Sequence, residues 1–115
     1  MKIIKKHPET LNAEDLYQLV LSPAVKKMKD FVGDVVHINA WIMYEDTDRN
    51  GNSHVVLSIM DNDSICRATN SPTFINDFEK MWELFDSVGN AVSAISVISG
   101  KSKANRDFIT CVFYE

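Results

Sequence analysis

Hydrophobic positions near the start of the chain recur at helical spacing. Leu16 and Leu19 follow two acidic residues, and acidic side chains suit the first turn of a helix. The pattern predicts a short helix that comes after a lysine-containing arm at residues 1–10. A second run, Ala24 to Phe31, resumes the helical spacing, and Gly33 is expected to end it.

From Val35 to Tyr44 the pattern changes to alternation of period two, which predicts a β-strand with two distinct faces. One expected face carries Val36, Ile38, Ala40 and Ile42, and the other carries His37, Asn39, Trp41 and Met43. Asn50-Gly51 is a strong turn signal, so this strand and the next are expected to form a hairpin. The four further predicted strands are His54 to Asp61, Ser64 to Thr69, Ala91 to Ser99 and Asp107 to Tyr114.

A longer helix is predicted between the third and the fourth of these five strands, which are Ser64 to Thr69 and Ala91 to Ser99. Ser71 can cap it, and Pro72 suits the first helical position. Large apolar side chains then recur every three or four residues at Phe74, Phe78, Met81, Trp82 and Phe85. This stripe is expected to pack on the core, and Gly89 is expected to stop the helix.

The predicted order is therefore a helix, three strands, a helix and two strands. A five-stranded barrel with a helix between its third and fourth strands is the OB topology, and an N-terminal helix is a common addition. We expect one α+β, mostly β domain over residues 1–115, with an arm and helix at 1–33 and an OB-like barrel at 34–115. A ferredoxin-like sheet or another small α+β sheet is the alternative, if one strand is misassigned.

Composition narrows the class of protein. The chain has 115 residues, of which 45% are hydrophobic and 24% charged, values close to those of ordinary globular domains. No apolar run approaches the roughly 18 residues that a membrane span requires, so we expect an intracellular protein. Cys66 and Cys111 each fall inside an apolar strand segment without a metal-ligand spacing, and both are expected to be reduced core residues.

Signatures of catalysis and of metal binding are missing. The three histidines are scattered, and there is no nucleophile elbow or Gly-rich phosphate loop. The run Asp46 to Gly51 resembles the opening of a calcium loop, but Leu57 stands where the bidentate acid is required. A solvated hairpin loop is the favoured interpretation, and we expect no enzyme activity, no metal and no cofactor.

Aromatic and basic residues are predicted to share one surface. These candidate nucleic-acid-binding residues are Trp41, Tyr44, Arg67, Lys101, Lys103, Arg106, Phe108 and Tyr114. Rings that stack on bases and cations that follow phosphates are the combination that single-stranded nucleic acid requires. The alternatives without a binding function are that Trp41 packs under the N-terminal helix and that the three loop cations are only a solvated surface. If that loop is not the phosphate track, the expected replacement is Lys26, Lys27 and Lys29.

Two segments carry a family resemblance, Ala68 to Phe74 and Ser99 to Cys111. They resemble small single-stranded DNA-binding proteins encoded by bacteriophages of Gram-positive bacteria. The resemblance implies an OB fold, sequence-tolerant binding of single-stranded DNA in phage replication or recombination, and self-association as a dimer or tetramer. It also implies action in the cytoplasm of the bacterial host, and it maps the binding loop onto Lys101, Lys103 and Arg106.

A function of another class competes with DNA binding. The formal net charge is -4, and Glu45, Asp46 and Asp48 could imitate nucleic-acid phosphates. These features are typical of an acidic protein-interaction module, such as a phage-encoded inhibitor of a host protein.

Overall fold

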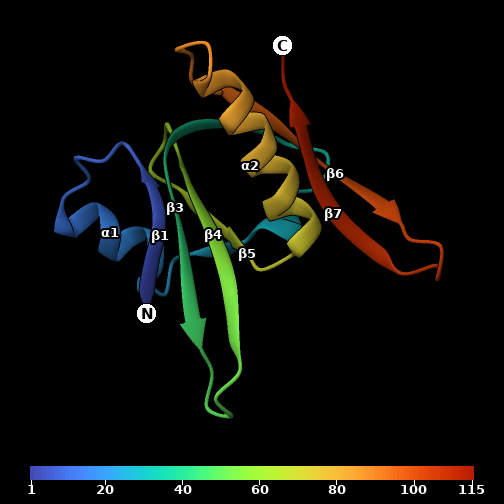
Figure 1. Ribbon diagram of the computed structural model, residues 1–115, viewed down its shortest axis with the longest axis horizontal. Coiled ribbons are helices and arrows are strands. Elements are labelled where there is room, and N and C mark those ends of the chain that lie inside the picture. Colours follow the sequence, from blue (N-terminus) through green and yellow to red (C-terminus); the bar gives the residue numbers. More distant parts are fainter.

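A computed structural model describes all residues from 1 to 115 as a compact, mostly β arrangement of the α+β class (Figure 1). Two α-helices accompany seven strands and one short 3-10 helix. In chain order the elements are β1 (Lys2–His7), α1 (Ala13–Val20), β2 (Lys26–Lys27), η1 (Met28–Phe31), β3 (Val35–Thr47), β4 (Ser53–Asp61), β5 (Cys66–Thr69), α2 (Pro72–Asp86), β6 (Ala94–Lys101) and β7 (Asp107–Phe113). Neither helix is both long and apolar enough to cross a membrane.

The strands form one curled sheet in the order β2-β5-β4-β3-β6-β7. All neighbours are antiparallel except β2 and β5. The long strand β3 holds the sheet together, because its first residues pair with β6 while its second half pairs with β1. The sheet therefore curls into a half-barrel, with β6 and β7 turned away from β3 and β4 (Figure 1).

The N-terminal region differs from the sequence prediction. The expected arm is strand β1, which pairs with β3 from Lys2 opposite Glu45 to His7 opposite Trp41. The expected second helix is instead β2, parallel to β5, followed by η1. An isolated helix as short as residues 24–31 is only marginally stable. Backbone hydrogen bonds to the edge strand β5 therefore outweigh the helical pattern of this segment. The strand count is therefore seven rather than five.

A register shift in β3 exchanges the faces that simple alternation predicts. The pairing with β4 is irregular between Ile38 and Ala40, which is the signature of a β-bulge. Val36 therefore lies in the same buried cluster as Trp41 and Met43, whereas alternation put them on opposite faces. The prediction of faces is correct before the bulge and wrong after it.

Each side of the sheet has its own core, covered by its own helix. α2 packs a cluster of 13 buried residues, and α1 contributes Leu19 to a second cluster of six. The predicted start of α2 is confirmed, since Ser71 caps it by accepting from the Phe74 amide and Pro72 is in the first turn. Phe74 and Phe78 are fully buried, as the aromatic stripe predicts.

Candidate nucleic-acid interface

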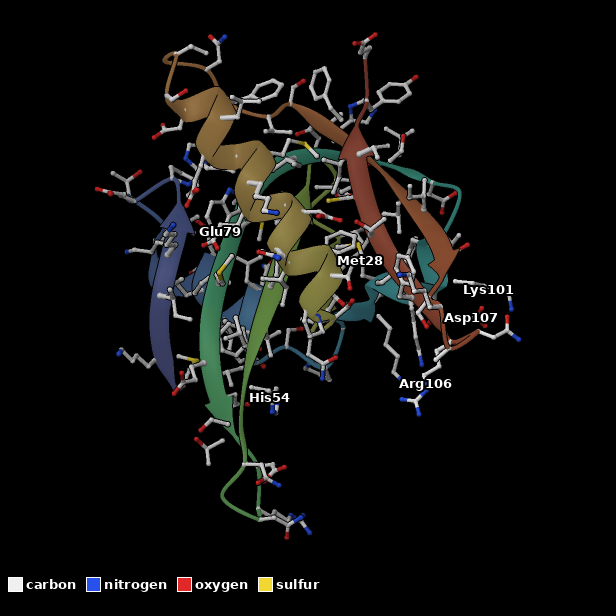
Figure 2. The ribbon with its side chains drawn as sticks, turned by 45° about the vertical axis from the view of Figure 1, so that its right-hand side comes forward. Met28, His54, Glu79, Lys101, Arg106 and Asp107 are labelled. Carbon is white, nitrogen blue, oxygen red and sulfur yellow. The ribbon has the colours of Figure 1, made fainter.

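The turn between β6 and β7 carries three exposed cations, Lys101, Lys103 and Arg106. The Arg106 amide donates to the Ser102 hydroxyl at 3.2 Å, and the Ser102 amide donates to the Arg106 carbonyl at 2.9 Å. These bonds fix the turn while its long side chains extend into solvent (Figure 2). Lys101 forms an exposed ion pair with Asp107 at 3.2 Å, and no ion pair involves Lys103 or Arg106.

Phe108 lies at the base of this turn. It pairs with Gly100 across the hairpin, and its ring covers that glycine so closely that an added β-carbon would stand 2.6 Å from Cζ. The ring is therefore positioned against backbone rather than inside the main core. It is half-buried, which leaves part of its surface free to contact a ligand.

A groove of about 680 Å³ runs beside Phe108. One wall is the segment from Thr69 to Thr73, where β5 ends and α2 begins, and the opposite wall is Ser99 with Asp107 to Ile109. Lys29 and Val32 complete its lining. The groove thus combines an aromatic ring, one cation, the carboxylate of Asp107, which is paired with Lys101, and several hydroxyl and amide groups.

A second hollow of about 330 Å³ continues this groove. The two share Lys29, Thr69 and Asn70, and the second hollow adds Lys27, Met28, Val56 and Ala68. We call the joined surface the β5–α2 groove. At one end its wall includes Asp107, which follows Arg106 of the cationic turn in the chain, and farther along it is lined by Lys29 and Lys27. An extended anionic chain in the groove would therefore pass both lysines and end beside the cationic turn.

The first turn of α2 also opens toward the β5–α2 groove, because Ser71, Pro72 and Thr73 line it. The N-terminus of a helix carries partial positive charge from its unpaired amides. Ser71 keeps this terminus rigid, since its amide donates to the Thr69 hydroxyl at 3.0 Å. The field of the helix therefore adds to that of the lysines in favouring an anion.

Trp41 does not reach this surface. Only 3% of it is exposed, and its ring packs edge-on against Phe78 at 5.4 Å and Trp82 at 5.1 Å. The prediction that Trp41 lies on an open face is wrong, and so is the alternative that it packs under the N-terminal helix, because Phe78 and Trp82 belong to α2. Its Nε1 is buried without a hydrogen-bond partner.

Tyr44 is also buried, at 7% exposure, within the second cluster beneath α1. Burial raises the pKa of its hydroxyl, and the nearby negative charge of Asp46 raises it further. The ring therefore has no open face on which a base could stack in this conformation.

Arg67 is a structural cation rather than an exposed one. It is 8% exposed, donates to the Asp61 carboxylate at 2.7 Å, and lies 4.3 Å from the ring centre of Phe31. Burial opposes ionisation of Asp61, but hydrogen bonds from Arg67 and from the Ile65 and Asp63 amides outweigh it and hold the pKa of that carboxyl below its ordinary value. The Arg67 guanidinium is therefore buried in an ion pair with Asp61 and is not an exposed cation of the candidate site.

Tyr114 is exposed but distant from the cationic turn. Its amide donates to the Ala94 carbonyl, which places it at the far end of the hairpin from Phe108. Tyr114 is six residue steps beyond Phe108 in the chain, an extended span of about 20 Å. The structure therefore brings together Lys101, Lys103, Arg106 and Phe108, and it separates them from Trp41, Tyr44, Arg67 and Tyr114.

The sequence pattern predicts that Lys27 and Lys29 lie on a helix. It offers them as phosphate contacts only if the loop with Lys101, Lys103 and Arg106 does not bind phosphates. The contribution of Lys27 and Lys29 to the β5–α2 groove depends on the parallel pairing of β2 with β5. A two-residue strand has no periodicity, so the run of lysines itself was the only available signal.

The acidic turns have structural partners of their own. Asp48 Oδ1 accepts from the Asn50 and Asn52 amides at 2.9 and 3.0 Å, which confirms the prediction of a hairpin loop. No group of three or more His, Cys, Asp or Glu side chains is arranged to hold a metal ion.

No family model, curated protein or solved structure matches the chain. The basis for a functional proposal is therefore the β5–α2 groove and the residues around it.

Proposed function

We propose that this protein binds single-stranded DNA without sequence preference, in the β5–α2 groove. The observation that carries the proposal is that Phe108 borders a groove lined by Lys27 and Lys29, while the exposed cations of the β6–β7 turn come directly before Asp107 and Phe108 in the chain. Cations along a track and a ring beside it are what a flexible strand of phosphates and bases requires.

An OB-like barrel is the fold that this proposal assigns to the curled sheet. Strands β3, β4, β5, β6 and β7 would be the five barrel strands, with α2 between the third and the fourth. The OB fold binds oligonucleotides on the face of its second and third strands, beside the loop that joins its last two strands. In this chain those elements are β4, β5 and the cationic β6–β7 turn.

Each residue has a distinct task in the proposed complex. Lys101, Lys103 and Arg106 contact phosphates at one end, and Lys27 and Lys29 continue this contact along the groove. Phe108 stacks on a base, a contact worth about 1 to 3 kcal/mol. Neither type of contact reads base edges, so binding tolerates any sequence.

The overall charge of -4 limits the expected affinity for single-stranded DNA. Acidic residues elsewhere repel the DNA at long range, so attraction depends on the local cations, and salt screens it readily. Affinity should therefore be moderate and strongly dependent on salt. The family resemblance adds the setting, in which a phage protein without enzyme activity coats DNA during replication or recombination in the bacterial cytoplasm.

Anisotropy of a fluorescein-labelled oligo-dT tests the proposal at low salt. Tryptophan fluorescence is a weaker probe, because Trp41 is buried and its neighbour Trp82 lies on α2 outside the groove. We expect saturable binding of oligo-dT and of mixed-sequence strands with similar affinity, and weaker binding of the matching duplex. Absence of binding at micromolar protein, or a preference for duplex, would contradict the proposal.

One observation favours the competing interaction module. Glu45, Asp46 and Asp48 are exposed on the β3–β4 hairpin, which projects from the body of the molecule (Figure 1). If this hairpin imitates DNA, neutralising the three acids to their amides should abolish capture of a host protein from nuclease-treated lysate. DNA binding should then be unaffected or stronger, which separates the two functions.

A further inference from the structure

A hollow of about 570 Å³ lies between β1 and the C-terminal half of α2. β1 forms one wall, Trp82, Glu83 and Asp86 of α2 form the other, and the buried Trp41 of β3 forms the floor. None of its lining residues lines the β5–α2 groove. We call it the β1–α2 hollow, and it is separate from the proposed DNA site.

Three aromatic rings meet at the floor of the β1–α2 hollow. His7 is directly opposite Trp41 across β1 and β3, so both side chains lie on the same side of the sheet. The ring centre of His7 is 4.6 Å from that of Trp82, and the Trp82 ring centre is 5.1 Å from that of Trp41. His7 and Trp82 are half-buried and offer ring surface to a ligand. Such surface attracts organic cations.

Trp41 brings an unpaired hydrogen-bond donor to this floor. Only 3% of the residue is exposed, and its Nε1 has no hydrogen-bond partner. A buried donor that has lost water and gained no partner is unfavourable, so an acceptor that reaches it stabilises a complex. Nε1 is closed to water, and we expect an acceptor to reach it when the half-buried His7 ring rotates aside. The hollow therefore favours a ligand that carries a carbonyl.

Carboxylates dominate the rim of the hollow. Lys5 Nζ lies 3.2 Å from an oxygen of Glu79 and 3.2 Å from an oxygen of Glu83, so these two glutamates share one ammonium. Glu79 is on the side of α2 that faces β1 (Figure 2). Glu9 and Asp86 are exposed and form no ion pair. The rim therefore carries excess negative charge, which attracts a cation and repels phosphates.

Lys6 does not cancel this charge. It also borders the hollow, but it pairs directly with Ile42 of β3, which belongs to the second cluster beneath α1. Directly paired side chains share one side of a sheet, so the Lys6 side chain leaves from the side opposite the hollow. DNA is therefore a poor ligand here, in contrast to the β5–α2 groove.

The rings, the unpaired donor and the carboxylates together select an arginine residue. A guanidinium is flat, lies against aromatic rings and donates to two carboxylates at once, whereas a lysine ammonium is a strongly hydrated point charge. An arginine within a peptide also carries a backbone carbonyl, which can accept from Trp41 Nε1. Free arginine is less suitable, because the acidic rim repels its α-carboxylate.

We propose that the β1–α2 hollow binds an arginine residue from an exposed segment of a partner protein. The guanidinium pairs with Glu83 and Asp86 beside the Trp82 ring, and the backbone carbonyl accepts from Trp41. The proposal depends neither on DNA binding nor on the acidic β3–β4 hairpin. One residue is a small contact, so a short peptide is expected to bind with a dissociation constant of about 0.1 to 1 mM.

Tryptophan fluorescence tests this site directly, because the chain has two tryptophans and both line the hollow. The probe is the blocked tripeptide acetyl-Gly-Arg-Gly-amide, titrated to about 10 mM into nuclease-treated protein. We expect a saturable change in emission. The matched peptide with citrulline is neutral and nearly the same shape, and it should show no saturation. The lysine peptide should bind at least about tenfold more weakly, and propylguanidinium, which lacks the carbonyl, at least about threefold more weakly.

Variants assign the contacts. Glu83→Gln and Asp86→Asn should each raise the dissociation constant of the arginine peptide at least about fivefold, because each removes a charge that faces the guanidinium. Trp41→Phe should raise it at least about threefold by removing the donor, while Trp82 still reports binding and oligo-dT binding is unchanged. Asp63→Asn, at an exposed position between β4 and β5, is the matched control and should bind like the parent. Thermal unfolding shows whether each variant is folded.

Emission that does not saturate with the arginine peptide would overturn the proposal. It would also be overturned by equal binding of the citrulline or lysine peptide, or by folded Glu83 and Asp86 variants that bind like the parent. Equal affinity for propylguanidinium would mean that the hollow takes small cations rather than a protein segment, which contradicts the proposal as well. Oligo-dT anisotropy reports on the β5–α2 groove separately, so failure of either proposal leaves the other intact.

Discussion

The ring of Phe108 lies over Gly100, so that a β-carbon on this glycine would stand 2.6 Å from the tip of the ring. This contact fixes where the ring meets the β5–α2 groove. Any larger residue at position 100 must displace it.

Phe108→Ala should therefore weaken binding of single-stranded DNA by about 1 to 3 kcal/mol, through loss of one stacked base. Gly100→Ala should weaken it in the same direction, because the ring is pushed from its position. In the double variant the Gly100 substitution should have no further effect, since the ring it displaces is absent. Additive losses in anisotropy titrations would show that the two residues act separately.

Trp41 is expected to affect folding rather than binding. Trp41→Ala removes a ring that packs on Phe78 and Trp82, and it should lower the free energy of unfolding by about 3 to 5 kcal/mol. Urea denaturation followed by circular dichroism measures this. Trp41→Phe should fold and bind oligo-dT like the parent protein. If the Trp41→Phe protein folds but binds oligo-dT more weakly at every salt concentration, Trp41 contacts DNA and this prediction is contradicted.

The Asp61–Arg67 pair predicts how stability depends on pH. The folded-state pKa of Asp61 lies below its ordinary value of 3.8, so its ionised form stabilises the fold above that pH. This contribution is lost as pH falls through the folded-state pKa. Asp61→Asn should cost about 3 to 5 kcal/mol at neutral pH, because Arg67 is left as a buried unpaired charge.

Urea midpoints measured between about pH 2 and pH 7 check this. The parent protein should lose stability below about pH 4 more steeply than the Asp61→Asn variant does. Parallel curves for the two proteins would show that the pair does not contribute.

The two cysteines should be inert in the folded protein. Burial raises the pKa of the Cys111 thiol to about 12, and the charge of Asp77 adds to this effect. Burial likewise raises the pKa of Cys66. A colorimetric disulfide reagent at about pH 8 should react slowly with native protein and rapidly with both thiols in urea. Fast reaction of either cysteine without urea would mean that its segment opens.

The parts of the fold that were predictable from sequence carry strong local signals. Ser71 and Pro72 define the start of α2, and Asn50-Gly51 defines the β3–β4 turn. β1 and β2 were missed because their pairing depends on residues distant in the chain. β2 has only two residues, too few for any period to be visible.

The candidate site was predictable only where it lies in a loop. Cations in a polar turn between strands extend into solvent in most folds, so Lys101, Lys103 and Arg106 are exposed as expected. Trp41 was misplaced because one face of β3 was expected to be open, whereas both faces are covered beyond Asn39. The bulge between Ile38 and Ala40 decides only which of the two cores Trp41 joins. Arg67 was misplaced because its partner Asp61 stands six residues earlier in the chain, at the end of another strand, and no local pattern links the two.

The salt dependence of oligo-dT binding tests the central claim most directly. For a single strand, each phosphate contact contributes about 0.7 to the slope of log affinity against log salt. Replacing Lys101, Lys103 and Arg106 together by Ala should therefore weaken binding and flatten the slope by about 2. Thermal stability should change little, since exposed charges contribute little to folding. The matched control replaces Lys2, Lys6 and Lys80, which are outside the groove, and should keep the parent slope despite the same loss of charge. Equal slopes for the parent protein and the loop variant would contradict the proposed phosphate track.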